Sequence, residues 1–132
     1  NKFFRKITKN KNKFSKTLEI KGRKLVLEDF YDGVAKFSFE DLCNKNLGPE
    51  DYLMIANNCD FICIENLPDF NENNSNQQQR FITLIDIIYE KKIPLMVTSQ
   101  VDLNLIQSSK SIAETFKRTI SRLYELTSKD YI

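Results

Sequence analysis

Apolar residues in this chain fall into short continuous runs and longer helical stripes. The run Phe61–Ile64 is apolar at every position, and so is Leu95–Val97, which follows Pro94. Runs of this kind are typical of strands buried on both faces of a parallel sheet. Between them, residues 77–89 carry apolar side chains at helical spacing. The order strand–helix–strand predicts a parallel pair joined by a right-handed crossover.

The first third of the chain has the pattern of antiparallel strands. Apolar positions alternate over 18–20 and 25–27, on either side of a stretch that contains Gly22, and this predicts a β-hairpin. Asp32-Gly33 predicts a second turn, followed by a short strand over 34–37. We therefore expect an α/β fold: a small mixed sheet with a parallel strand–helix–strand core, a β-hairpin near the N-terminus and flanking helices.

Local signals place two short helices between the hairpin and the first buried run. Ser38 can cap a helix that ends at Cys43. Pro49 is suited to the first position of a helix that runs to about Asn57.

The remaining elements are expected in the second half of the chain. The Asn/Gln-rich residues 71–79 predict a mobile loop that leads into the central helix. Ser111 and Glu114 have the spacing of a capping box, which predicts a helix from there to about Leu126. The expected core face of that helix is Ile112, Phe116, Ile120 and Leu123.

Positive charge is concentrated at one end of the chain. Residues 1–24 carry a net charge of +9, whereas the rest of the chain carries −7. We expect a basic arm over 1–16 and a single domain over 17–132. So basic a block can attract nucleic acid or an acidic partner. No groove-reading or aromatic-interleaved motif accompanies the lysines, so nucleic acid is the less favoured partner and an arm that touches its own protein is preferred.

Several kinds of chemistry are disfavoured by the composition. The chain has no histidine, which removes the commonest general base, and its three cysteines lack the spacing of a metal site. Buried thiols in a reducing, cytoplasmic compartment are expected instead. No stretch is long and apolar enough for a membrane span. The phosphate-loop pattern G-x-x-x-x-G-K-[ST] is also absent, so we expect no catalytic residue, metal or cofactor within this chain.

The strongest candidates for a binding role are Arg118 and Arg122. At i,i+4 they share one helix face, where two guanidinium groups suit a phosphate or a carboxylate. The alternative is local pairing, of Arg118 with Glu114 and of Arg122 with Glu125. Both readings stay open at this stage.

Three further residues are weaker candidates. Glu65 follows the first buried strand, where a P-loop ATPase has its Walker B acid. Ser99 or Gln100 ends the next strand, where a sensor residue would lie. Arg80 and Asp86 occupy the polar edge of the central helix and are expected on a solvated or interdomain face. Without a phosphate loop, these positions have ordinary structural explanations.

In this order, the segments resemble the C-terminal part of the ZapE family of cell-division ATPases and its mitochondrial relatives, a branch of the AAA+ P-loop ATPases. The resemblance covers about residues 17–132. The strings that carry it are Gly22-Arg23, Gly33-Val34-Ala35, Phe37-Ser38-Phe39-Glu40-Asp41-Leu42-Cys43, Leu47-Gly48, Asp51-Tyr52-Leu53, Arg80-Phe81-Ile82-Thr83-Leu84-Ile85-Asp86, Arg118-Thr119 and Ser121-Arg122-Leu123.

The resemblance implies a P-loop-like fold that lacks its phosphate loop. In the family, the ATP- and Mg-binding motifs precede this region, so a longer parent would bind and hydrolyse ATP and act on protein partners such as the division ring. This chain would contact the upstream ATPase core, and the parent would form homo-oligomers. Its own part would be coupling, nucleotide sensing or partner binding. The competing hypothesis is a free-standing, non-enzymatic module that grips an acidic or nucleic-acid partner with its basic arm.

Overall fold

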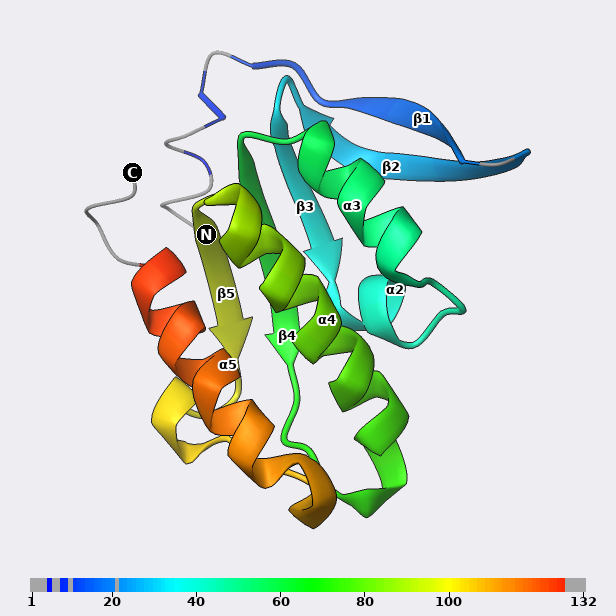
Figure 1. Ribbon diagram of the computed structural model, residues 1–132. Coiled ribbons are helices and arrows are strands. Elements are labelled where there is room, and N and C mark those ends of the chain that lie inside the picture. The colour runs from blue at the N-terminus through cyan, green and yellow to red at the C-terminus, as the bar shows by residue number, and fades with distance from the viewer. Residues whose placement is uncertain (1–4, 6–7, 10, 21, 128–132) are drawn as a thin grey trace.

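The computed structural model describes residues 5, 8–9, 11–20 and 22–127. It contains a five-stranded sheet in the order β1-β2-β3-β4-β5. The helices α2, α3, α4 and α5 all lie on the same face of this sheet (Figure 1). The expected α/β class and mixed sheet are confirmed. Within the described residues, no helix is both long and apolar enough to cross a membrane.

The predicted hairpin is present, and its strands are longer than the alternating pattern indicated. β1 (Phe14–Ile20) and β2 (Arg23–Tyr31) are antiparallel, with a register shift between Phe14 and Lys16. Because β1 begins at Phe14, the strand includes the last residues of the predicted basic arm. The division into arm and domain is still a prediction, and residues 1–4, 6–7 and 10 of the arm lie outside the described residues.

A two-residue turn joins β2 to β3 (Val34–Ser38), as the Asp-Gly pair predicts. Asp32 and Gly33 have φ of 48° and 92°, and two positive φ values in succession are the requirement of the tight hairpin turn that favours Asp-Gly. A Cβ on Gly33 would lie 2.5 Å from the Asp60 carboxylate. The backbone conformation therefore favours glycine here, and a larger residue would also displace the Asp60 side chain.

The two short helices form where their capping signals place them. In α2 (Phe39–Cys43), the Asp41 backbone N–H donates to Ser38 Oγ at 3.1 Å. α3 (Pro49–Asn57) has Pro49 at its first position, and the Gly48 N–H donates to Asp51 Oδ2 at 2.8 Å. These two helices make up the connection from β3 to the next parallel strand.

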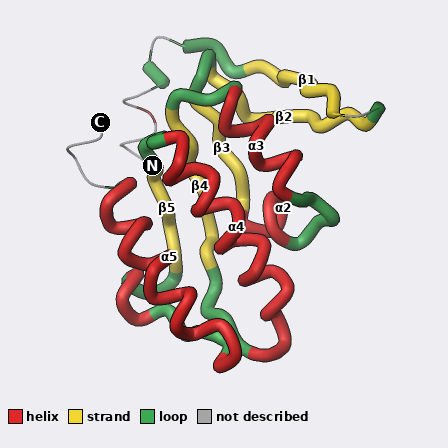
Figure 2. Tube along the Cα trace, in the orientation of Figure 1, coloured by secondary structure: helices red, strands yellow, loops and turns green. Residues whose placement is uncertain are grey.

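The strand–helix–strand core is confirmed as the centre of the domain (Figure 2). β4 (Phe61–Leu67) pairs in parallel with β3 on one side and with β5 (Leu95–Ser99) on the other. α4 (Ser75–Lys91) connects β4 to β5 and lies over the sheet. Its residues Phe81, Leu84, Ile85 and Ile88 are buried, as the helical stripe predicts.

The prediction of a mobile loop over residues 71–79 is wrong. Glu72–Asn74 form the short 3-10 helix η1, and α4 already begins at Ser75. Gln78 is fully buried and hydrogen-bonded on both sides of its amide. Side-chain amides that would suit a solvated loop instead bond to backbone groups and to side chains of neighbouring segments, so the polar composition is compatible with helical structure here.

The last helix is confirmed, but its predicted capping box is wrong. α5 (Ala113–Leu126) is preceded by η3 (Lys110–Ile112), and its N-cap residue Ile112 makes no side-chain capping bond. The extra 3-10 turn moves Ser111 inside the helical segment, where its hydroxyl lies 3.3 Å from that of Ser109. The predicted core face is confirmed, since Phe116 and Leu123 are buried and Ile112 and Ile120 are partly buried against the core. Thr119 and Leu126 are buried as well.

The core lies between the sheet and the helix layer. Four phenylalanines from separate elements meet there, with ring centroids 5.4–6.1 Å apart: Phe39, Phe70, Phe81 and Phe116. Tilted and edge-on rings at these separations add to the stability that their burial provides. This cluster fixes α4 and α5 relative to each other and so positions the polar residues along their outer edges.

Candidate functional site

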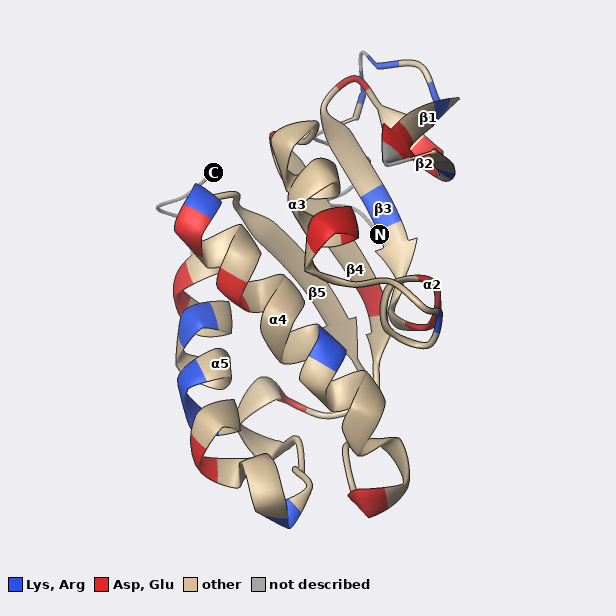
Figure 3. Ribbon diagram, turned by 45° about the vertical axis from the view of Figure 1, so that its right-hand side comes forward, with Lys and Arg blue, Asp and Glu red and all other residues tan. Residues whose placement is uncertain are grey.

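Asp86 on α4 joins the two arginines that the sequence singles out. The Arg122 Nη1 donates a short hydrogen bond to Asp86 Oδ1. The Arg118 Nη2 lies 3.9 Å from the other carboxylate oxygen of Asp86. Both arginines come from successive turns of α5, which packs beside α4 with charged positions along both helices (Figure 3). One carboxylate therefore neutralises most of the repulsion between two adjacent guanidinium groups.

Tyr89, one turn beyond Asp86 on α4, supports Arg122 from a second side. The Arg122 guanidinium carbon lies 4.6 Å from the centre of the Tyr89 ring, which is cation–π contact distance. The Tyr89 hydroxyl donates to Glu125 Oε2 at 2.8 Å, so Glu125 is engaged by the tyrosine. Sequence reasoning missed Tyr89, although its i+3 position from Asp86 was a signal that both lie on one face of α4.

The local pairing that was one of the two alternatives does not form, although both arginines do have an ion-pair partner. The ion-pair partner of both is Asp86, whereas Glu114 pairs with Lys117 at 3.0 Å. Exposed ion pairs between residues close in sequence contribute little to the free energy of unfolding. A carboxylate on a packed neighbouring helix, by contrast, is already fixed in place, so fewer side-chain rotamers must be ordered to use it.

The two arginines differ in what remains available for a ligand. The Arg122 side chain is 23% exposed, and its guanidinium is occupied by Asp86 and Tyr89. The Arg118 side chain is 58% exposed, and among the described residues its ion-pair contact is the long one to Asp86. Arg122 therefore has a mainly structural environment, and Arg118 is the member of the pair that could accept an external phosphate or carboxylate.

Arg80 makes a structural contact. Its Nη1 donates to the Cys43 carbonyl oxygen at 3.0 Å, at the end of α2 where helix carbonyls lack intrahelical partners. Nearby, the Tyr52 hydroxyl donates to the Leu42 carbonyl oxygen at 2.6 Å. Together these bonds hold the end of α2 against α3 and α4.

Glu65 lies at the end of β4, on the sheet face opposite the helices, where it pairs with Lys36 at 3.5 Å. Ser99, at the end of β5, donates its hydroxyl to the Val101 carbonyl oxygen. Both side chains are thus engaged locally. The structure brings these strand ends side by side, as a parallel sheet requires, but it does not bring Glu65 near the arginines of α5.

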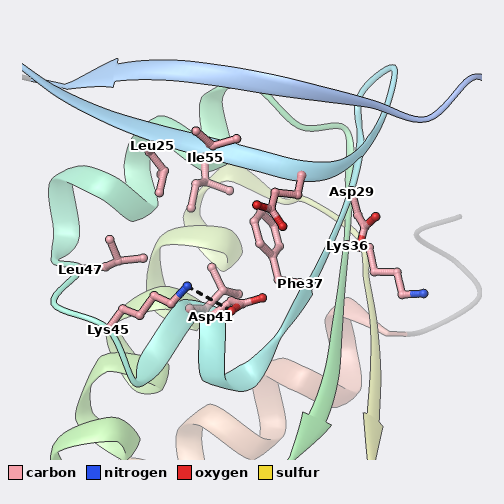
Figure 4. Close-up of a pocket in the computed structure, with 11 residues that line it drawn as sticks. Leu25, Asp29, Lys36, Phe37, Asp41, Lys45, Leu47 and Ile55 are labelled. Atoms are coloured by element: carbon pink, nitrogen blue, oxygen red, sulfur yellow. Dashed lines mark ion pairs between the residues drawn. The ribbon is translucent and has the colours of Figure 1, made fainter.

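A pocket of about 280 Å³ opens between β2 and the helices α2 and α3. Its apolar wall includes Leu25, Phe37 and Ile55, and at its mouth Lys45 Nζ lies 3.2 Å from Asp41 Oδ1 (Figure 4). Sequence reasoning gave no indication of this pocket because its wall combines residues from the hairpin and from both helices. Its lining carries both signs of charge: Asp41 pairs with Lys45, while Lys36 and Asp29 pair with Glu65 and Lys13 outside the pocket.

The thiols are unsuited to nucleophilic chemistry. Cys43, Cys59 and Cys63 are free and buried. Burial raises the pKa of each thiol to about 12, so the reactive thiolate is scarce at neutral pH. Among the described residues there is also no group of three or more side chains that could hold a metal ion.

Three lysines of the basic arm contact the chain's own hairpin region: Lys11, Lys13 and Lys16. Lys13 pairs with Asp29 at 2.7 Å, and this pairing raises the pKa of Lys13. Lys11 Nζ donates to the Asp32 carbonyl oxygen at 2.7 Å, and Lys16 lies 5.0 Å from the centre of the Phe30 ring. These contacts agree with the expectation of an arm that touches its own protein. That nucleic acid is an unlikely partner is still a prediction.

Comparison with known proteins relates the whole chain to one family. Residues 1–132 match the model of the family described as AFG1-like ATPase. The chain is 29% identical over 122 residues to the cell division protein ZapE of Escherichia coli, a match that covers 92% of this chain and 32% of that protein. It is 34% identical over 89 residues to lactation elevated protein 1 homolog B of Danio rerio, covering 67% of this chain and 18% of the relative.

The matched region is only part of each relative. It spans about a third of the bacterial protein and less than a fifth of the zebrafish protein. An uncharacterised protein of Schizosaccharomyces pombe is 31% identical over 84 residues. That match covers 64% of this chain and 18% of the relative. No solved structure matches the chain.

Proposed function

This chain belongs to the AFG1-like ATPase family, and from that membership we propose that it is the C-terminal module of a longer ATP-hydrolysing protein. The longer protein would bind Mg-ATP in a part outside these 132 residues and use hydrolysis to act on protein partners. The module would couple that ATPase core to a partner or to a neighbouring subunit. Arg118 would be its contact to an anionic group.

One observation carries the proposal: the family match extends over 1–132, yet the sequence lacks the phosphate-loop motif that cradles a nucleotide. A phosphate loop needs closely spaced glycines ahead of a helix. Gly22 and Gly33 instead lie in hairpin turns, and Gly48 precedes α3 without the lysine and hydroxyl residues of the motif. Glu65, at the position of a Walker B acid, is paired with Lys36. These residues do not fit an ATP–Mg site.

The role proposed for Arg118 follows from its surroundings. Asp86 holds the neighbouring Arg122 in place, so one turn of α5 is fixed while the Arg118 side chain extends into solvent. An exposed guanidinium on a fixed helix can bind a phosphate or a carboxylate in two-point geometry without rearrangement. The anion would be the nucleotide of the ATPase core or a carboxylate of a neighbouring subunit.

The name of the Escherichia coli relative supports a cell-division context. We propose a cytoplasmic protein that forms homo-oligomers and acts on components of the division ring. In this setting the module would contact the upstream ATPase core of its own chain.

The test compares two neighbouring cations of α5 in the full-length protein. Arg118→Ala should lower ATP turnover or its stimulation by partner at least about tenfold, because a guanidinium that stabilises developing charge is not replaced by solvent. Lys117→Ala is the matched control, since Lys117 is exposed on the same helix and pairs only with Glu114. The free energy of unfolding of both variants should lie within about 0.5 kcal/mol of the parent's, as is usual for surface substitutions.

Two results would refute parts of this proposal. Appreciable ATP turnover by residues 1–132 alone would place the active site within the chain. Unchanged turnover and coupling in Arg118→Ala would remove the proposed role of the arginine, while leaving family membership untouched.

A further inference from the structure

The strands β2 and β3 run side by side over only part of their length. Their ladder covers residues 29–31 of β2 and residues 34–36 of β3. Farther along β3, Phe37 pairs with β4, whereas residues 23–27 of β2 pair with β1. The hairpin of β1 and β2 therefore diverges from the rest of the sheet (Figure 1). The pocket of about 280 Å³ lies in the space that opens between β2 and the helices α2 and α3.

The inside of this pocket is apolar. Four side chains from β2, β3, α3 and the loop before α3 form its walls: Leu25, Phe37, Ile55 and Leu47 (Figure 4). Three of them, Leu25, Phe37 and Leu47, are only partly buried. Val26, which also lines the pocket, is 49% exposed. An apolar side chain placed here would remove this surface from water, which is favourable.

A hydrogen bond and an ion pair fix the helical walls of the pocket. The Tyr52 hydroxyl of α3 donates to the Leu42 carbonyl oxygen of α2 at 2.6 Å. At the mouth, Lys45 Nζ lies 3.2 Å from Asp41 Oδ1 (Figure 4). A pocket with ordered walls loses little conformational entropy when it binds a ligand, so more of the contact energy contributes to affinity.

Among the described residues that line the pocket, Glu28 is the one charged side chain without an ion-pair or hydrogen-bond partner. The other four each form an ion pair: Asp29, Lys36, Asp41 and Lys45. Glu28 is exposed and lies where the pairing of β2 with β1 shifts, just before the ladder with β3 begins. Irregular pairing of this kind redirects side chains, and here it leaves a carboxylate available beside an apolar pocket.

The surroundings of Glu28 favour a positively charged ligand. Lys13 is influenced by Glu28 but is bonded to Asp29 at 2.7 Å. Among the charges that raise the pKa of Lys13, that of Glu28 has the smallest effect. Residues 25–132 contain ten basic and seventeen acidic residues, a net charge of −7. A lysine or arginine of a partner would therefore be attracted to this domain and would find a free carboxylate beside the pocket.

We propose that the pocket and Glu28 together bind an exposed, extended segment of a protein partner. An apolar side chain of that segment fills the pocket, and a lysine or arginine two residues away pairs with Glu28. Side chains two residues apart in an extended segment point to the same side, so one segment can make both contacts. At about 280 Å³ the pocket is at the lower limit of ligand-binding pockets, so it suits one side chain and not a nucleotide. The inference rests on the proposed function and deepens it, because it names the chemistry of the protein partner.

Peptide binding to the full-length protein is the first measurement. The probe is the dye-labelled peptide Lys-Ser-Phe-Ser-Lys, which has a cation on either side of one aromatic residue, and fluorescence anisotropy gives its affinity without ATP. Replacing the phenylalanine by alanine should weaken binding at least about tenfold, because no large apolar side chain then fills the pocket. Replacing both lysines by glutamate should weaken it about three- to tenfold. Equal affinity of the three peptides would overturn the proposal.

Reversing the charge at position 28 is the second measurement. Glu28→Lys in the full-length protein should reverse the preference, so that the glutamate peptide binds more tightly than the lysine peptide. Glu19→Lys is the matched control, since Glu19 is an exposed acid of the same hairpin outside the pocket lining, and it should leave the preference unchanged. A reversal in neither variant, or in both, would show that Glu28 does not select the charge and would overturn the proposal.

Filling the pocket is the third measurement. Leu47→Trp should occupy the apolar space and lower the affinity for the probe at least about tenfold. Leu53→Trp, at an exposed position of α3 outside the lining, should change the affinity less than about twofold. An equal loss in the two variants would show that the probe does not enter the pocket. If Leu47→Trp fails to fold, the charge reversal at Glu28 still decides.

The outcomes separate this inference from the proposed function. A full-length protein that hydrolyses ATP but binds the three peptides equally refutes the binding site alone. Selective peptide binding by a protein without ATPase activity refutes the proposed function alone. Selective binding by residues 1–132 that is lost in the full-length protein would show that the parent's own chain occupies the pocket, and it would overturn the proposed partner.

Discussion

Asp86 and Arg122, 36 residues apart in the chain, form a charge-assisted hydrogen bond that connects α4 to α5. The Asp86 and Arg122 side chains are both partly exposed, at 36% and 23%. The bond therefore joins the last helix to the rest of the domain at a point close to solvent.

Replacing Asp86 should weaken the docking of α5. Asp86→Asn removes the negative charge that faces both arginines, and we expect a loss of about 1 kcal/mol in the free energy of unfolding, since a partly exposed pair is screened by solvent. Urea unfolding at low and high salt measures this, and the loss should shrink as salt rises. Glu90→Gln, at an exposed position of the same helix, should cost less than about 0.5 kcal/mol. An equally large loss in Glu90→Gln would show that the change in net charge, and not the contact of Asp86 with the arginines, lowers the stability.

Arg122 and Arg118 should differ in their effect on stability. From spacing alone both would be surface residues of similar effect, but the structure surrounds Arg122 with Asp86 and Tyr89. We expect Arg122→Ala to cost about 1–2 kcal/mol and Arg118→Ala less than about 0.5 kcal/mol. Melting temperatures of the two variants test this directly. Equal effects would mean that the contacts of Arg122 add nothing to stability.

Gln78 should be needed to hold the segment that precedes α5 against α4. Its amide nitrogen donates to Ser108 Oγ at 2.7 Å, and its amide oxygen accepts from the Ser109 N–H at 3.1 Å. Gln78→Ala would leave a buried N–H unsatisfied, and we expect a loss of about 2 kcal/mol. Gln79→Ala, at the next and exposed position, is the control and should be nearly neutral. Similar chemical denaturation midpoints for the two variants would show that the hydrogen bonds of Gln78 do not stabilise the fold.

Glu72 should make stability depend on acidic pH. Its carboxylate accepts from the Lys110 N–H at 2.8 Å and from Ser109 Oγ at 2.8 Å, and these bonds lower its pKa below the ordinary value of 4.5. The unfolded chain then binds the proton more readily. The stabilisation by Glu72 is therefore fully present above pH 4.5 and is lost as the pH falls through the lowered folded value.

Glu72→Gln is the variant that isolates this effect. Urea midpoints measured from about pH 6 to about pH 3 should show the parent more stable at the upper end and the two proteins converging at the lower end. A stability difference that stays constant over this range would show that the hydrogen bonds of Glu72 do not depend on its charge.

Several features of this protein follow from its sequence because they depend on neighbours along the chain. The Asp32-Gly33 turn requires two positive φ values that this pair adopts readily, and Ser38 caps α2 through a backbone group three residues away. The apolar runs Phe61–Ile64 and Leu95–Val97 predicted the strands that the structure has over Phe61–Leu67 and Leu95–Ser99, because such runs favour a place inside a sheet. The first run is buried at every position, whereas in the second only Leu95 is buried.

Other features were decided by the tertiary structure. Arg122 pairs with Asp86 because α5 packs beside α4, and no local spacing could select that carboxylate over Glu125. Gln78 is buried because residues 108–109 fold back onto α4 and satisfy its amide, although its composition alone suggested a solvated loop. The physical reason is the same in both cases: a polar side chain takes the partner that packing brings within hydrogen-bond distance, and packing is determined by the whole chain.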